Sequence, residues 1–266
     1  MTAPNDVGLA RIRRHLTAMG AESLTLFKGN YFDRRLQSRL RVRGVPDSDT
    51  YADLLDRDPD ERRRLVSALA IGVTGFFRNP IAWGRLGSLL GDSAAPVTFT
   101  AWSAGCATGE EAWSLALLLA DLEGRGRGPI DWRVEGTDLD DRSLEVARTG
   151  VYSPRATADI AAVLGSAPGD VSSDRFTIPA EVRQRVRFRQ ADLAAAPPMG
   201  DLDLILCRNV LIYFTPAAQS RVMDQLLGAL RPGGLLMLGK AELAAFDLLP
   251  RLEIVDRRER IYRRIA

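Results

Sequence analysis

The sequence of 266 residues has one histidine and two cysteines, and this scarcity limits its chemistry. A catalytic triad needs a histidine beside its nucleophile, and His15 lies in the N-terminal segment. Zinc sites rich in histidine are excluded, and Cys106 and Cys207 are too few for an all-cysteine site. We expect these thiols to be reduced packing residues. The sequence therefore predicts a reaction without a metal or an imidazole base.

Long apolar stretches and excess charge are absent as well. The run Leu115–Ala120 is far shorter than the roughly 20 residues that span a bilayer, and the N-terminus has no apolar core of a secretory signal. We therefore expect a cytoplasmic protein. The net charge is only +2, but residues 1–45 carry nine Lys or Arg and three acids. This basic segment favours an acidic macromolecular partner.

Residues 9–90 have the pattern of a helical domain. Apolar residues recur every four positions within residues 32–40, which is typical of one buried helix face. Asp58 and Asn79 each precede a proline, the arrangement of an N-cap followed by the first helical residue. A short linker is predicted at residues 91–96.

Residues 97–266 are predicted to form an α/β domain in which short strands alternate with helices. We expect strands at 97–103, 132–138, 185–191, 202–208, 234–240, 252–258 and 260–265, and helices near 109–123, 140–149 and 216–230. This order predicts a mostly parallel, seven-stranded, doubly wound sheet that binds ligands at the carboxyl ends of its strands. The last two strands should pair antiparallel, and residues 154–180 should be a variable insertion.

The turn after the first strand selects the ligand. The segment that begins at Gly105 has neither the lysine of a P-loop nor the glycine spacing of a dinucleotide site. Glu110 and Glu111 would repel a phosphate, although acids there also complement the helix dipole. S-adenosylmethionine fits better, because it carries adenosine and positive charge without phosphate. Asp138 ends the second strand, where an acid can accept from ribose hydroxyls, and Asp140 should cap the next helix.

Five stretches in order resemble the chemotaxis receptor methyltransferases, the CheR family of protein-glutamate O-methyltransferases. They are VTGFFRNP (73–80), WSAGCATGEEAWSLA (102–116), GTDLDDRSLEVARTGVYS (136–153), LILCRNVLIYF (204–214) and LLGALRPGGLLMLGKAEL (226–243). The resemblance implies an all-α N-terminal domain on a class I, Rossmann-like methyltransferase domain. It also implies S-adenosylmethionine as donor, with S-adenosylhomocysteine as product, and glutamate carboxylates of a chemoreceptor as acceptors.

The resemblance implies roles for individual residues as well. Those expected to bind the cofactor are Thr74, Arg78, Gly105, Glu110, Asp138, Asp192, Leu193, Arg208 and Asn209. Arg78 and Tyr213 are expected nearest the transferred methyl group. Those expected to face the helical cytoplasmic domain of the receptor are Lys28, Arg35 and Arg41. GKAEL departs from the family pattern, and the insertion does not resemble the small β-subdomain with which some members grip a receptor tail.

A glutamate acceptor suits this composition, because its carboxyl group has an ordinary pKa near about 4.3 and needs no general base. Arg78 would orient that carboxylate, and Tyr213 would donate a second hydrogen bond. Two alternatives stay open. One is a class I methyltransferase with another acceptor, although RNVLIY lacks the prolines of enzymes that grip a flipped base. The other is a non-catalytic signalling module that binds the cofactor or its product. We expect a monomer that neither binds nucleic acid nor inserts into a membrane.

Overall fold

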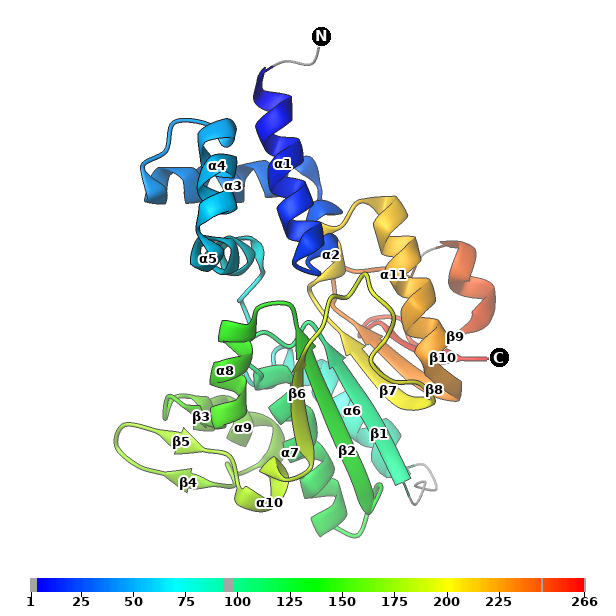
Figure 1. Ribbon diagram of the computed structural model, residues 1–266. Helices are drawn as coiled ribbons and strands as arrows, with labels where there is room; N and C mark the ends of the chain where they lie inside the picture. The colour runs from blue at the N-terminus through cyan, green and yellow to red at the C-terminus, as the bar shows by residue number, and fades with distance from the viewer. Residues whose placement is uncertain (1–3, 93–97, 245, 266) are drawn as a thin grey trace.

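The computed structural model describes residues 4–92, 98–244 and 246–265. The N-terminal part is built from helices: α1 (Pro4–Ala18), α2 (Glu22–Thr25), α3 (Gly29–Arg43), α4 (Ser48–Arg57) and α5 (Pro59–Leu69). They gather at one end of the molecule and the sheet lies at the other (Figure 1). Asp47 and Asp58 begin α4 and α5, because each carboxylate accepts the backbone N–H three residues on. The all-α N-terminal region is confirmed.

A buried acid organises the helical part. Phe32, Leu36 and Leu40 of α3 are buried, as their spacing predicts. On α5, Glu61 is fully buried. Its carboxylate accepts from Arg39 Nε at 2.7 Å and Nη2 at 2.6 Å. The ion pair between Arg39 and Glu61 therefore holds α3 and α5 together.

The C-terminal part contains the seven-stranded sheet that the sequence predicts. Its strands are β1 (Thr98–Ala104), β2 (Asp131–Asp138), β6 (Val186–Gln190), β7 (Leu202–Cys207), β8 (Leu230–Leu238), β9 (Leu252–Asp256) and β10 (Ile261–Arg264). Their order is β6-β2-β1-β7-β8-β10-β9, with β10 antiparallel to both neighbours and the other pairs parallel. Every residue of β7 is buried, as expected for a central strand covered on both faces.

Helices cover both faces of the sheet, and two buried clusters divide the core. The flanking helices are α6 (Pro80–Asp92), α7 (Glu110–Gly124), α8 (Asp141–Thr149) and α11 (Pro216–Ala229). Trp83 and Leu86 of α6 share one cluster with α7. The helical part shares the other with α11 and the sheet's central strands. The domain limits stay predictions, and residues 93–96 of the expected linker lie outside the described residues.

The insertion differs from its expected form. Residues 151–183, which include the expected insertion, hold β3 (Val151–Tyr152), α9 (Ala156–Leu164), β4 (Asp170–Val171), β5 (Phe176–Thr177) and α10 (Ala180–Arg183). The strands form a small antiparallel sheet in the order β3-β5-β4, so a small β-subdomain is present where none was expected. Strands of two residues are too short to show an alternation of apolar and polar residues, so no pattern predicts them. Buried Phe176 and Ile178 anchor this sheet to the main core.

Two short 3-10 helices complete the elements, η1 (Leu211–Tyr213) and η2 (Phe246–Arg251). Asn79 stands before α6 as predicted, but its backbone is left-handed, with φ 63°, instead of the extended form usual at an N-cap. Its side-chain oxygen accepts from Arg208 at 3.2 Å. None of the helices that the structure describes is both long and apolar enough to cross a membrane.

Candidate active site

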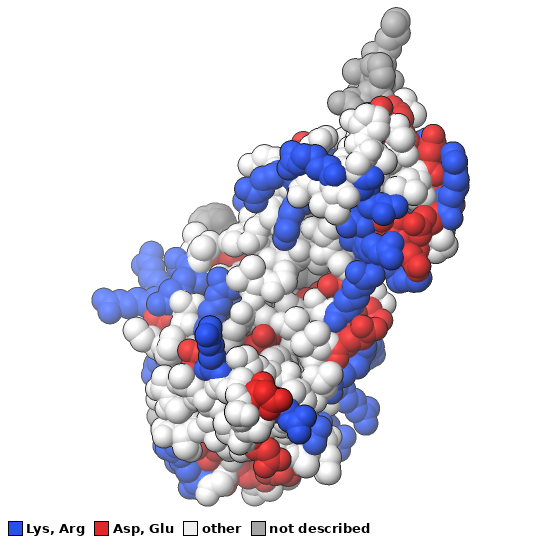
Figure 2. Space-filling model, turned by 90° about the vertical axis from the view of Figure 1, so that its left-hand side faces the viewer, with Lys and Arg blue, Asp and Glu red and all other residues white. Residues whose placement is uncertain are grey.

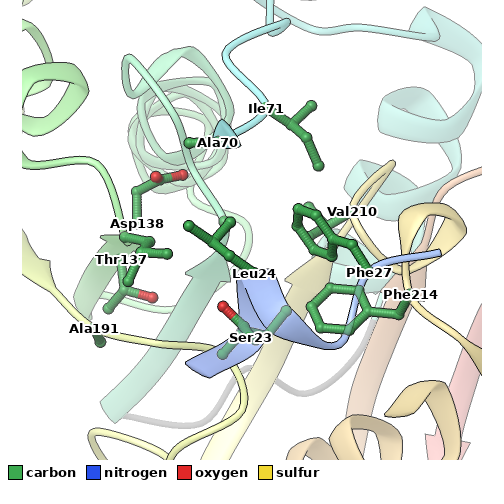
Figure 3. A pocket seen from close by; sticks show the side chains of 13 residues that line it. Ser23, Leu24, Phe27, Ala70, Ile71, Thr137, Asp138, Ala191, Val210 and Phe214 are labelled. Carbon is green, nitrogen blue, oxygen red and sulfur yellow. The ribbon is translucent and has the colours of Figure 1, made fainter. Parts of the chain in front are cut away.

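Two adjoining pockets lie at the carboxyl ends of the sheet strands, where the helical part covers the sheet. The first, shown in Figure 3, contains about 500 Å³ of empty space that is partly open to solvent. Its lining residues are Ser23, Leu24, Phe27, Ala70, Ile71, Gly105, Thr137, Asp138, Leu139, Ala191, Leu193, Val210 and Phe214. The lining is mostly apolar, with Asp138 as its one charged side chain. A flat heterocycle fits such a pocket.

The second pocket, of about 380 Å³, shares Ile71, Gly105 and Val210 with the first. Its other lining residues are Val73, Thr74, Gly75, Arg78, Ala107, Glu111, Arg208 and Asn209. This pocket is polar and holds charges of both signs. Of the predicted cofactor residues, four line the second pocket, two line the first, and Gly105 lines both.

Gly105 is where the two pockets meet. Its φ of 79° is left-handed, and a Cβ there would lie 2.8 Å from Val210 Cγ2. The backbone N–H groups of Gly105 and Cys106 both donate to the carbonyl of Thr137, at 2.8 and 2.9 Å. Glycine is therefore required, because any side chain would push the loop after β7 away from the turn after β1.

Asp138 accepts two backbone hydrogen bonds that the sequence does not predict. Its carboxylate oxygens accept the backbone N–H groups of Ala107 at 2.8 Å and Asp140 at 2.9 Å. Asp140 occupies the N-cap position of α8, but its side chain accepts no backbone N–H there. It accepts instead from Ser67 Oγ at 2.6 Å and from Ser143 Oγ at 2.8 Å. Burial raises the pKa of Asp138, and its backbone hydrogen bonds work against that rise. Each oxygen keeps a second lone pair for a ligand hydroxyl.

The two adjacent glutamates at the start of α7 have different surroundings. Glu111 lines the second pocket, whereas Glu110 lines neither pocket and accepts from Thr108 Oγ1 at 2.7 Å. The side chain of Glu111 is 12% exposed; it accepts from Ser103 Oγ at 2.9 Å and lies 3.4 Å from Arg208 Nη1. Burial raises the pKa of Glu111, and Arg208 only partly offsets that effect. Glu111 is therefore the glutamate that lines the second pocket, and the expected cofactor contact of Glu110 stays a prediction.

Arg208 lines the second pocket and is almost completely buried. Its side chain is 2% exposed, and Nη2 donates to the carbonyl of Arg78 at 2.7 Å. The guanidinium also lies over the ring of Trp83. Its Nε is buried and has no hydrogen-bond partner among the described residues. Arg208 thus fixes the segment that carries Arg78 and places a positive charge at the wall of the second pocket.

Asp192 and Tyr213 line neither pocket. Asp192 accepts the backbone N–H of Ser23 at 2.9 Å, so it holds α2 over the first pocket while its neighbour Leu193 lines it. The ring of Tyr213 packs on Tyr31 of α3, with centroids 4.6 Å apart. The expected direct roles of Asp192 and Tyr213 therefore stay predictions.

The three expected receptor contacts also differ from one another. Lys28 Nζ donates to the carbonyl of Ile212 at 2.7 Å. Arg35 donates to Tyr31 Oη and to the carbonyl of Ala70, each at 3.1 Å. Both cations thus bind within the molecule. Arg41 is exposed and has no side-chain partner among the described residues. Figure 2 shows Lys and Arg over both ends of one face, so positive charge is not confined to the helical part.

Sequence reasoning missed Glu242. This buried carboxylate accepts backbone N–H groups of the segment after β7, although it lies about 30 residues further along the chain. The only signal was its place in GKAEL, at the position of the glutamate of the family pattern.

Comparison with known proteins identifies the family. Residues 72–255 match the model described as "CheR methyltransferase, SAM binding domain", and residues 9–70 match "CheR methyltransferase, all-alpha domain". The chain belongs to the CheR methyltransferase family. It is therefore an S-adenosylmethionine-dependent methyltransferase, and its cofactor is the one that the glycine turn and the acids predict.

Named relatives cover most of the chain. It is 32% identical over 244 residues to "Chemotaxis protein methyltransferase 2" of Pseudomonas aeruginosa, which covers 87% of this chain and 85% of that protein. It is 30% identical over 256 residues to "Chemotaxis protein methyltransferase" of Escherichia coli, and the matched region covers 90% of this chain and 85% of that protein. An "Uncharacterized 104.1 kDa protein" of Rhodobacter capsulatus is 35% identical over 260 residues. The matched region covers 96% of this chain but only 27% of that much longer protein.

The described residues fit this cofactor. The first pocket offers an apolar lining, with Asp138 at its edge. The second offers the Glu111 carboxylate and the charged guanidinium of Arg208. An amino acid moiety carries both an ammonium and a carboxylate, so the second pocket matches both of its charges.

Proposed function

We propose that the protein methylates glutamate side-chain carboxylates of a chemoreceptor, giving γ-glutamyl methyl esters. One observation carries the proposal: Arg78 lines the second pocket, whose single acid is Glu111. Glu111 is paired with Arg208, and the only histidine is His15, bonded to Asp56 in the helical part. Such a site suits an acceptor that arrives as an anion and needs no proton removed.

The cofactor would lie across both pockets. Phe27 and Val210 would pack on its adenine, and Asp138 would accept from its ribose hydroxyls. Glu111 would accept from its ammonium, and the positive charge of Arg208 would attract its carboxylate. When bound, S-adenosylmethionine supplies an electrophilic methyl group on a sulfonium.

Arg78 would orient the acceptor. Its Nη1 donates to the carbonyl of Val73 at 3.2 Å, which leaves other donors of the guanidinium for a carboxylate. Holding one oxygen would aim the other at the methyl group, and positioning of this kind contributes up to about 7–11 kcal/mol to catalysis. The covering helices would limit water around two charges that neutralise each other.

The receptor would approach over α3. Arg41 is the predicted receptor contact whose side chain stays free of partners among the described residues, so it can bind an acidic receptor helix. Tyr31 and Arg35 lie on the same helix and contact Tyr213 and Ala70, beside the pockets. This arrangement would place the docking helix next to the transfer site.

The test is incubation of the protein with tritiated S-adenosylmethionine and the cytoplasmic domain of a methyl-accepting chemoreceptor. We expect label on the receptor that mild base releases as methanol, and no label on a receptor whose methylation glutamates are replaced by alanine. A base-stable label, or equal labelling of the alanine form, would contradict a glutamate ester. Product binding without transfer to any receptor would favour the non-catalytic alternative.

A further inference from the structure

Glu242 is a buried carboxylate compensated by main-chain donors. The residue is 3% exposed. Its Oε1 accepts the backbone N–H groups of Val210 at 2.8 Å and Leu211 at 2.7 Å. Its Oε2 accepts those of Asn209 at 2.8 Å and Gly239 at 2.7 Å. No Lys or Arg forms an ion pair with Glu242 among the residues that the structure describes.

The backbone that Glu242 holds belongs to both pockets. Val210 lines the two pockets, and Asn209 lines the second. Asn209 has a φ of 62°, a left-handed conformation that needs support from its surroundings. The four N–H donors would be unsatisfied without an acceptor, and an unsatisfied buried donor is costly. Glu242 therefore fixes the shape of this segment.

Gly239 allows the carboxylate to come this close. A Cβ on Gly239 would lie 2.7 Å from Glu242 Oε2 and 2.8 Å from the backbone nitrogen of Asn209. Only glycine leaves room for the ends of β7 and β8 to share one carboxylate. The charge of Glu242 also adds to the rise in the pKa of Glu111, after burial itself. Both effects act on the cofactor pockets.

We propose that Glu242 is a positioning residue for cofactor binding: its carboxylate holds residues 209–212 in the conformation that closes both pockets. It touches neither the cofactor nor the acceptor, and it acts through the backbone of Asn209 and Val210. The proposal rests on the cofactor alone and not on the identity of the acceptor.

The test variant is Glu242→Gln, which keeps the size but puts an NH₂ group where an acceptor is needed. We expect the Kd for S-adenosylhomocysteine, measured by calorimetry, to rise at least about tenfold. The matched control is Glu61→Gln, a fully buried acid in the helical part. It should lower the unfolding temperature and leave this Kd within about twofold of the wild-type value.

Two outcomes of this comparison of Glu242→Gln with Glu61→Gln would overturn the proposal. One is a folded Glu242→Gln variant with the wild-type Kd. The other is an equal loss of affinity in both variants, because affinity would then follow overall stability. If Glu242→Gln does not fold, Glu242→Asp keeps the charge with a shorter reach, and it should fold with a Kd between about three and ten times the wild-type value; an unchanged Kd contradicts the proposal. Wild-type protein that binds the product but methylates no receptor would instead overturn the glutamate methyltransferase assignment.

Discussion

The helical part and the strand ends bury acids in opposite ways. Glu61 in the helical part accepts from Arg39 and Tyr51, and Arg43 lies 3.2 Å away. Burial works to raise the pKa of Glu61, but these partners outweigh it, so the pKa lies below its usual value. At the strand ends, burial prevails: the pKa values of Glu111 and Asp138 are both raised.

This difference separates structural acids from ligand-binding acids. The acid of the helical part is fully compensated by side chains of the protein, so it adds stability and nothing for a ligand. At the strand ends Arg208 pairs with Glu111, and Asp138 is held by backbone N–H groups alone. Acids with raised pKa values favour a bound cation, which restores the charged form. A cationic cofactor supplies that charge.

The largest expected effect comes from removing the charge of Glu61, the buried acid of the helical part. Glu61→Gln removes the counter-charge of Arg39, whose side chain is only 14% exposed. Removing one member of a buried pair costs about 3–5 kcal/mol, so we expect a loss of that size in the free energy of unfolding. Urea denaturation monitored by circular dichroism measures it. A loss below about 1 kcal/mol would show that the pair does not organise the helices.

The next effect contrasts two arginines. Arg78→Ala should lower the rate of methyl transfer about 100-fold or more, because the acceptor loses its orienting group, with little change in the unfolding temperature. Arg39→Ala should do the reverse, since its guanidinium is bound to Glu61. Single-turnover assays and thermal unfolding of both variants measure the two effects. Equal turnover of Arg78→Ala and the wild type would remove Arg78 from the mechanism.

As the pH falls, cofactor binding at the strand ends should weaken before the helical part loses stability. The raised pKa of Glu111 means that its free carboxyl group takes up a proton above its usual range, and the protonated form cannot accept from an ammonium. The Kd for S-adenosylmethionine should therefore rise by up to about tenfold per pH unit below that pKa. The stability from Glu61, whose pKa is lowered, should persist until the pH falls further. Parallel calorimetry and thermal melts from pH 8 to pH 4 check the order; melting before cofactor loss contradicts it.

The smallest effect concerns the helix surface. Arg41→Ala should raise the KM for the receptor about threefold to tenfold and leave kcat unchanged, because an exposed docking charge contributes about 1 kcal/mol. Arg14→Ala, a change of another exposed arginine of the helical part, is the control. An unchanged receptor KM in Arg41→Ala would move the docking surface elsewhere.

Most of the fold was predictable because its signals are local. Strand and helix alternation, prolines at helix starts and apolar spacing placed α7 and the seven strands within a few residues of their observed bounds. The small sheet of the insertion was not predictable, since strands of two residues carry no periodicity.

The site was predictable in its residue types more than in its contacts. Gly105, Asp138 and Arg208 all reach the pockets, as the resemblance implies. The choice between Glu110 and Glu111 depends on the rotation of α7, because successive residues differ by about 100° around a helix. Lys28 and Glu242 bind backbone atoms far away in the chain, and no side-chain pattern records such partners.

The most direct test of the strand-end acids compares two adjacent residues. Calorimetric titration with S-adenosylmethionine at pH 8 should give a Kd at least about tenfold higher for Glu111→Gln than for the wild type, since an ammonium loses its charged acceptor. Glu110→Gln should bind with a Kd within about twofold of the wild-type value, because its carboxylate lines neither pocket. Wild-type affinity in Glu111→Gln, or a greater loss in Glu110→Gln, would contradict the account.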